Sequence, residues 1–194
     1  MTTILPIVEG DGDIAAVPEL IRRIAYAHGK FDIEVSRPHK RGDLPKVMRR
    51  FDDFLQTALL EKSPVIWVLD YDCAECKDHV HDARLLNARA KKLAGSVLVE
   101  FVFMVKEFET LFLADEQATR AVFADIPADL AFPRNPESIR DAKGWISAAR
   151  PSGSAYKPMS HQQRVTARLN LDRLRTGCDS FCRFETAVLR LTDS

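Results

Sequence analysis

Short apolar runs alternate with amphipathic stretches along this chain. Residues 4–8 and 65–69 are apolar throughout, which is typical of strands covered on both faces of a sheet. Residues 31–35 alternate apolar and polar side chains, and residues 97–105 form a further apolar run, so we expect strands there too. The resulting order, βαβαβαβ, predicts a Rossmann-like α/β fold with a mainly parallel sheet of about four strands and helices on its faces.

The stretches between and after these runs have the spacing of helices. Ile14, Val17, Leu20, Ile21 and Ile24 form an apolar stripe with a period of 3.6 residues, which predicts a helix after the first strand. By the same criterion, we expect further helices at 45–58, 79–93, 109–123, 138–149, 161–174 and 181–191. The sequence therefore predicts an α/β core over residues 1–125 and a helical extension over residues 126–194 that packs on the core.

Composition narrows the class of protein. The chain has 194 residues, of which 46% are hydrophobic and 29% charged, as in a globular protein with a substantial core. Lysine plus arginine and aspartate plus glutamate both number 28, so no net basicity marks a nucleic-acid binder, although a neutral total can conceal separate patches. We find neither a signal peptide nor an apolar run near the ~18 residues of a membrane span, and we expect a cytoplasmic protein.

Acidic residues follow the predicted strands. Glu9 and Asp13 come after the first strand, and Asp70 and Asp72 come directly after residues 65–69. Because parallel strands of an open α/β sheet place their carboxyl ends at one edge, these carboxylates are expected to converge there and to bind a hard cation such as Mg²⁺ or Mn²⁺. Asp13 taken alone could instead be a helix N-cap, worth about 1 kcal/mol.

A third acidic pair, Glu107 and Glu109, follows the fourth strand, and one of the two is a candidate ligand. Lys157 lies in a predicted loop, where a solvated lysine is the ordinary interpretation. The Asp-x-Asp of Asp70 and Asp72 also occurs in haloacid dehalogenase phosphatases and in nucleotide-sugar transferases. The first of these is disfavoured because its motif follows the first core strand and is followed by threonine.

Two other groups of residues suggest binding sites. Cys73 and Cys76 are followed by histidines in a spacing like that of a zinc cluster, but Cys178 and Cys182 are one helical turn apart and do not form a matching pair. We therefore expect reduced cysteines and no zinc. The basic residues that could meet a nucleic-acid backbone are Arg37, His39, Lys40 and Arg41, although a solvated loop has the same composition.

The order of the acidic motifs resembles the TOPRIM domain, the metal-binding module of topoisomerases, primases and overcoming-lysogenization-defect (OLD) nucleases. The matching segments are Glu9-Gly-Asp-Gly-Asp13, Asp70-Tyr-Asp72 and Glu107-Phe-Glu109, followed by Tyr156-Lys157-Pro158 and Cys178-Asp-Ser-Phe181. The chain is also similar to small stand-alone bacterial TOPRIM-like proteins of unknown function.

This resemblance implies a function and residue roles. Glu9, Asp13, Asp70, Asp72 and Glu109 would hold one or two Mg²⁺ ions, Glu9 would also act in catalysis, and Lys157 would stabilise the charged phosphorane. OLD nucleases carry an ATPase domain, whereas this chain has no Gly-x-x-x-x-Gly-Lys-[Ser/Thr] loop, so an ATPase would be a separate partner. The implied setting is phage defence or DNA repair.

Three functions stay open at this point. The leading one is a Mg²⁺-dependent nuclease that cleaves DNA or RNA. The second is a TOPRIM-like module that binds nucleic acid or a partner without cutting. The third is a metal-dependent nucleotide-sugar transferase that uses Asp70 and Asp72, in which Glu9 and Asp13 would have no role. A homo-oligomer is compatible with each of the three.

Overall fold

The computed structural model of the chain describes residues 1–72, 78–151 and 154–193. In this part of the chain, five strands form one sheet in the order β2-β1-β4-β5, with β3 also paired to β1. All of these pairings are parallel, as the sequence predicts. The strands are β1 (Thr2–Val8), β2 (Ile33–Val35), β3 (His39–Lys40), β4 (Val65–Tyr71) and β5 (Val99–Val105).

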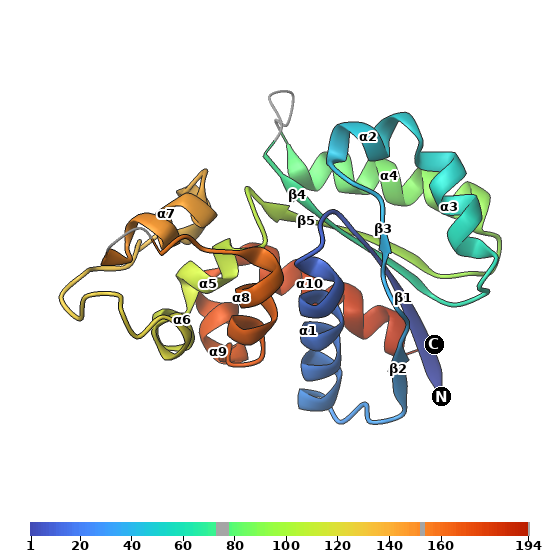
Figure 1. Cartoon of the computed structure of the whole chain (residues 1–194). Helices are drawn as coiled ribbons and strands as arrows, with labels where there is room; N and C mark the ends of the chain where they lie inside the picture. Colours follow the sequence, from blue (N-terminus) through green and yellow to red (C-terminus); the bar gives the residue numbers. More distant parts are fainter. Residues whose placement is uncertain (73–77, 152–153, 194) are drawn as a thin grey trace.

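Helices cover both faces of the sheet (Figure 1). One face packs against α1 (Asp13–Ala27) and α10 (Asp179–Thr192), and the other against α2 (Leu44–Arg49), α3 (Phe51–Leu59) and α4 (His79–Ala94). The side chains of each strand alternate between the two faces. In β1, for example, Ile4 and Val8 belong to the core on the α1 face, whereas Leu5 and Ile7 belong to the core on the α3 face. The predicted α/β class is therefore confirmed.

Pro6 lies inside the central strand β1, although proline cannot donate a hydrogen bond to a ladder. The backbone of Leu5 faces β4, because its N–H donates to the Pro64 carbonyl, so the backbone of Pro6 faces the opposite neighbour. On that side β2 pairs with residues 2–4 of β1 and β3 pairs with residues 7 and 8. Pro6 therefore falls in the gap between the two short strands, where no ladder hydrogen bond is lost.

The chain after β5 folds into short helices beside the sheet (Figure 1). Their residues share one hydrophobic core with α1 and with the strands, so α8 packs on α1 and α10 lies against β5. The elements are α5 (Thr110–Ala114), α6 (Glu116–Val122), the 3-10 turn η1 (Pro136–Ser138), α7 (Ala142–Ala148), α8 (Pro158–Thr166) and α9 (Leu171–Gly177).

Three helices predicted as continuous are interrupted in the structure. The helix expected at 45–58 breaks at Arg50, where φ is −122°, and forms α2 and α3. The helix expected at 109–123 breaks at Asp115, whose carboxylate caps α6 by accepting the Ala118 N–H. The helix expected at 161–174 divides into α8 and α9, because the Asn170 side chain caps α9. In the second and third breaks, a short polar side chain competes with the helical backbone hydrogen bonds.

Within the described ranges, none of the helices combines the length and the apolar character needed to cross a membrane.

Gly12 marks a close approach between the start of α1 and the extension. A Cβ atom at this position would lie 2.0 Å from Gln162 Oε1 and 2.7 Å from Pro158 Cβ, so a larger residue forces α8 away from α1. We expect Gly12→Ala to lower the free energy of unfolding by about 1–3 kcal/mol in chemical denaturation. Gly10→Ala is the matched control from the same turn, because its Cβ would meet its nearest neighbour at an ordinary 3.5 Å. Equal effects of the two changes would contradict this packing argument.

Candidate metal centre

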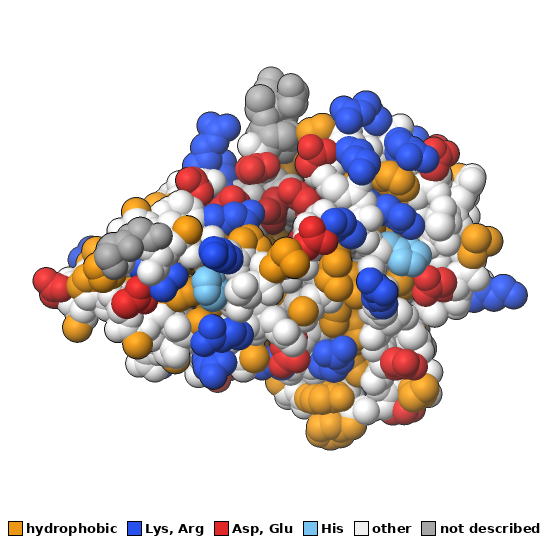
Figure 2. Space-filling view, viewed as in Figure 1, with side chains coloured by type: hydrophobic (Ala, Val, Ile, Leu, Met, Phe, Trp, Pro, Cys, Tyr) orange, Lys and Arg blue, Asp and Glu red, His pale blue; other side chains and the backbone are white. Residues whose placement is uncertain are grey.

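Carboxylates from different strand ends line one cavity at the carboxyl edge of the sheet. Glu9 follows β1, Asp70 is the penultimate residue of β4, and Glu109 comes shortly after β5. Together with Asp13 at the start of α1, these side chains line a cavity of about 260 Å³ that α8 and Lys143 close from the other side. Figure 2 shows acidic side chains gathered in a hollow on this face, with basic side chains nearby.

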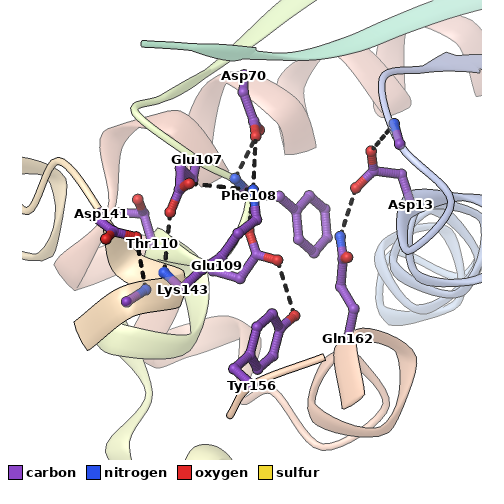
Figure 3. A network of polar contacts seen from close by, with 12 residues as sticks. Asp13, Asp70, Glu107, Phe108, Glu109, Thr110, Asp141, Lys143, Tyr156 and Gln162 are labelled. Atoms are coloured by element: carbon purple, nitrogen blue, oxygen red, sulfur yellow. Dashed lines mark hydrogen bonds and ion pairs between the residues drawn. The ribbon is translucent and has the colours of Figure 1, made fainter. Parts of the chain in front are cut away.

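Asp13 is the first residue of α1 and not its cap, because Gly12 occupies the N-cap position. Its Oδ2 atom accepts the Gly10 N–H at 2.8 Å, and its Oδ1 atom accepts the Gln162 side-chain amide at 2.5 Å (Figure 3). These two bonds fix the carboxylate between the first turn and α8. The simple N-cap interpretation of Asp13 is therefore not what the structure shows.

Asp70 fixes the turn that carries the third pair of acidic residues. Its Oδ1 atom accepts the Phe108 N–H at 2.8 Å (Figure 3). Just before this contact, the chain leaves β5 through Lys106, whose φ of 68° lies in the left-handed region that non-glycine residues rarely adopt. Asp70 thus holds a tight turn that directs Glu107 and Glu109 back over the edge of the sheet.

Glu109 is the most deeply buried carboxylate of the group, with 1% of its surface exposed. Its Oε1 atom accepts a hydrogen bond from the Tyr156 hydroxyl at 2.9 Å (Figure 3). Its Oε2 atom is buried and accepts no hydrogen bond, although Lys143 Nζ lies 3.5 Å away. A buried carboxylate oxygen left in this state is costly, and a cation in the cavity would relieve that cost.

Lys143 is the site residue that sequence reasoning missed. It lies on α7, and its ammonium group is 3.2 Å from Glu107 Oε1 and 3.5 Å from both Asp70 Oδ2 and Glu109 Oε2. The backbone N–H of Lys143 also donates to Glu107 Oε2 at 3.1 Å. The predicted helix at 138–149 contained this lysine, but nothing local to it indicated which of the basic residues after β5 would reach the acidic edge.

Burial and mutual repulsion perturb the ionisation of the cluster. Burial, then the charges of Asp13 and Asp72, raise the pKa of Glu9 to about 7. Burial also raises the pKa of Glu109 to about 7, although Lys143 and the Tyr156 hydroxyl act against it. The pKa of Asp70 rises well above its usual value, again chiefly through burial. For Lys143, burial lowers the pKa and the facing carboxylates raise it. The carboxylates have the larger combined effect, so the pKa of Lys143 is raised.

The structure places two other predicted residues away from the cavity wall. Asp72 lies just past β4 and is exposed, but it is near enough for its charge to raise the pKa of Glu9. Lys157 is exposed at the start of α8 and lines a different hollow with Arg150 and His161. The cation next to the carboxylates is therefore Lys143. Cys73 and Cys76, considered above as zinc ligands, lie outside the described residues.

The basic segment at residues 37–41 runs beside the acidic turn. Lys40 pairs with Val8 in the sheet, one residue before Glu9, and its ammonium group binds Asp11 at 2.7 Å. His39 contacts Glu61 at 2.8 Å, and the Arg41 guanidinium lies 5.1 Å from the centre of the Phe54 ring. Arg37 is exposed. Lys40 and Arg41 thus lie beside the turn that carries Glu9, since the Arg41 N–H also donates to the Val8 carbonyl, whereas His39 is directed to Glu61.

The ligand set suits a hard divalent cation. Every candidate ligand in the cavity is a carboxylate, the donor type that Mg²⁺ and Mn²⁺ prefer, and Glu109 Oε2 is a buried oxygen that lacks a hydrogen bond. In the described part of the chain, no three histidine, cysteine or acidic side chains are already arranged around one metal position. In the structure, the Lys143 ammonium lies between Asp70, Glu107 and Glu109, within 3.5 Å of each.

Comparison with known proteins identifies the family. The chain belongs to the family described as a domain of unknown function, DUF4276, whose family model matches residues 8–189. No curated protein sequence matches the chain.

Solved structures with a related chain path come from OLD proteins. The C-terminal region of the Burkholderia pseudomallei OLD protein is 14% identical, with a TM-score of 0.45 over 100% of this chain and 98% of that one. The C-terminal region of the Xanthomonas campestris pv. campestris OLD protein is 15% identical, with a TM-score of 0.43 over 98% of this chain and 94% of that one. We transfer no residue role from similarities at this level.

The raised pKa of Glu9 predicts a pH-dependent stability. Because this carboxyl group binds its proton more tightly in the folded than in the unfolded protein, its contribution to stability falls as pH rises from about 4.5 to about 7. Glu9→Gln removes that loss. In EDTA at pH 8, we expect the variant to exceed the wild type in free energy of unfolding by about 2 kcal/mol, with little difference at pH 4.5.

The control for this prediction is Glu34→Gln, which changes an exposed carboxylate on β2. Urea denaturation across the pH range measures both variants. If the Glu9 and Glu34 variants followed the same pH profile, the carboxyl group of Glu9 would not be perturbed by the cluster.

Proposed function

We propose that this chain is a divalent-metal-dependent nuclease that hydrolyses phosphodiester bonds of DNA or RNA. The observation that carries the proposal is the set of carboxylates from three strand ends that lines one cavity around a single ammonium group. Glu9, Asp13, Asp70, Asp72 and Glu109 would hold Mg²⁺ or Mn²⁺. When bound, the metal would supply positive charge to the phosphate oxygens and activate water as the nucleophile.

The charge of the cavity explains why a metal would be needed. Glu9, Asp13, Asp70, Glu107 and Glu109 face one lysine, so the ionised cluster carries an excess of negative charge that repels a phosphate group. Burial is the main cause of the raised pKa values of Glu9, Asp70 and Glu109, and the neighbouring carboxylates raise them further. Substrate binding and cleavage should therefore both depend on the cation.

Lys143 is the side chain that we assign to the developing charge of the transition state. Its ammonium group lies within 3.5 Å of Asp70 and Glu109, so it is next to any phosphate that reaches these carboxylates. The ion pairs to Glu107 and Asp70 hold it in place before substrate arrives, and such preorganised charge is an effective form of transition-state stabilisation. Glu9, at the mouth of the same cavity, would orient the attacking water.

The nucleic-acid backbone would follow the basic segment beside the cavity. Lys40 and Arg41 lie beside the turn that carries Glu9, and together with Arg37 and His39 of the same segment they would lead bound phosphates towards the cluster. We further propose that a separate ATPase works with this chain, in phage defence or DNA repair. That part of the proposal rests on the order of the acidic motifs, which resembles that of the OLD nucleases.

One observation favours a second candidate, a TOPRIM-like module that binds nucleic acid or a partner without cleaving. Lys143 already neutralises part of the cluster, and a lysine in this place can serve as a permanent internal counter-ion. The two candidates differ in an assay of the purified chain on single- and double-stranded DNA and RNA with Mg²⁺ or Mn²⁺, alone and with a candidate ATPase. Metal binding without cleavage of any substrate would favour the module.

Asp70→Asn tests the negative charge of Asp70 without removing its hydrogen bond to the turn. The asparagine side-chain oxygen can still accept the Phe108 N–H, so the turn that carries Glu109 is retained while one negative charge is lost. We expect the variant to fold, to bind Mg²⁺ at least tenfold more weakly in calorimetry and to lose phosphodiester cleavage. Circular dichroism controls for folding. Wild-type cleavage by Asp70→Asn would refute the metal site.

Lys143→Met tests the assignment of the basic residue. Removing a cation that competes for the carboxylates should tighten Mg²⁺ binding, whereas cleavage should slow by about a hundredfold because the transition-state charge loses its partner. A lysine that only supports the fold would not shift metal affinity and turnover in opposite directions.

Lys157→Met is the matched comparison for that test, because Lys157 is exposed and lines a separate hollow. We expect it to cleave within a few-fold of the wild-type rate. If Lys157→Met lost activity and Lys143→Met did not, Lys157 would be the residue that stabilises the transition state, as the resemblance to the OLD nucleases implies.

A further inference from the structure

Strand β5 forms an edge of the sheet and has β4 as its one strand neighbour in the described chain. The N–H of Val65 donates to the Leu98 carbonyl and the N–H of Lys106 to the Tyr71 carbonyl, so the even-numbered residues of β5 face β4. The backbone groups of Val99, Phe101 and Phe103 therefore point away from β4, towards the open edge.

Side chains bind the hydrogen-bond groups at the end of this edge, whereas those in its middle are unpaired within the described ranges but covered, since Phe101 is 3% and Phe103 2% exposed. The N–H of Val105 donates to Ser180 Oγ at 2.9 Å, and the Val105 carbonyl accepts from the Thr110 hydroxyl at 3.2 Å. For Phe101 and Phe103, no backbone partner on the open side lies among the described residues. Unpaired backbone groups at a sheet edge are a template for an additional strand.

A groove runs along this edge between two helices. Helices α4 and α10 lie on opposite faces of the sheet at β5 (Figure 1), and a hollow of about 300 Å³ between them reaches Phe101 and Phe103. A second hollow of about 270 Å³ shares residues with the first and extends it to Lys91. From His79 to Lys91, α4 spans about 18 Å, the length of about five residues of extended chain.

The walls of this groove are basic. Arg84 and Lys91 come from α4, and Arg183 and Arg190 come from α10. The one carboxylate among the described residues that line it is Glu100, which lies 3.6 Å from Arg190 and is thereby compensated. The groove therefore combines backbone hydrogen-bond groups at its floor with positive charge on both walls.

We propose that this groove binds an extended acidic segment of a partner protein, which adds to β5 as a further strand. Main-chain hydrogen bonds to Phe101 and Phe103 would supply affinity once the peptide displaces the side chains that cover this edge. Carboxylates on successive residues would meet α4 on one face and α10 on the other. A second copy of this chain does not fit, because two such edges would bring like-charged walls together. The backbone floor favours a peptide over nucleic acid.

The test measures fluorescence anisotropy with the full chain and a fluorescein-labelled nine-residue peptide, Glu-Glu-Val-Val-Glu-Glu-Val-Val-Glu, which as a strand presents glutamates on both faces. We expect saturable binding that weakens at least tenfold when alternate peptide amides are N-methylated, and no binding when lysine replaces glutamate. Arg84→Glu and Arg190→Glu, one on each wall, should each weaken binding at least tenfold, and Thr186→Trp should block the groove. Arg164→Glu, an exposed arginine on α8, is the control and should bind as the wild type does.

Specific results would overturn the proposal. Equal binding of the N-methylated peptide would exclude strand addition. Binding of a labelled oligonucleotide that is lost in Arg84→Glu, without peptide binding, would assign the groove to nucleic acid. Loss of dimerisation in Thr186→Trp by analytical ultracentrifugation would assign it to a second copy. Cleavage assays do not enter this test, so its failure leaves the proposed nuclease function unaffected.

Discussion

Carboxylates buried at one edge of a sheet repel one another, and this fold meets that constraint with the ammonium group of Lys143. Asp70, Glu107 and Glu109 all lie within 3.5 Å of it. Without such a cation, the desolvation of several carboxylates in one cavity would be hard to sustain. The long excursion between β5 and α8 is thereby tied to the sheet, since α7 delivers Lys143 to the cluster through both its side chain and its backbone N–H.

The lysine compensates only part of the charge. Glu9 and Glu109 still have pKa values near 7, and Glu109 Oε2 is buried without a hydrogen bond. The surrounding packing thus holds the cluster together at some electrostatic cost, as is common at functional sites. A divalent ion would lower that cost, and because it would displace the protons that these carboxyl groups hold, its affinity would rise with pH. Protonation and stability are therefore linked in this protein, and a bound metal would be linked to both.

The sequence predicted the parts of this site that depend on local signals. Apolar runs identify β1, β4 and β5, and the parallel order then places Glu9, Asp70 and Glu109 at one edge without any knowledge of tertiary contacts. The choice between Lys143 and Lys157 could not be made in this way, because Lys143 falls in a predicted helix and Lys157 in a predicted loop, and neither signal tells which lysine reaches the cavity. Only the path of the chain brings α7 over it. The breaks at Arg50 and Asp115 were missed for a related reason, since the apolar stripe continues through each.

Strand β5 connects the two surfaces to which we assign functions. Its carboxyl end leads through Lys106 to Glu107 and Glu109, while its open edge forms the floor of the basic groove. Ser180 separates the two regions, because its hydroxyl already holds the Val105 N–H. A segment bound along β5 would therefore end before Val105, more than two residues short of Glu107, and would leave the cavity accessible. Because β5 is buried between two cores, it is a stiff connection between the bound segment and the turn at Lys106. A partner could therefore be held next to the cluster without covering it.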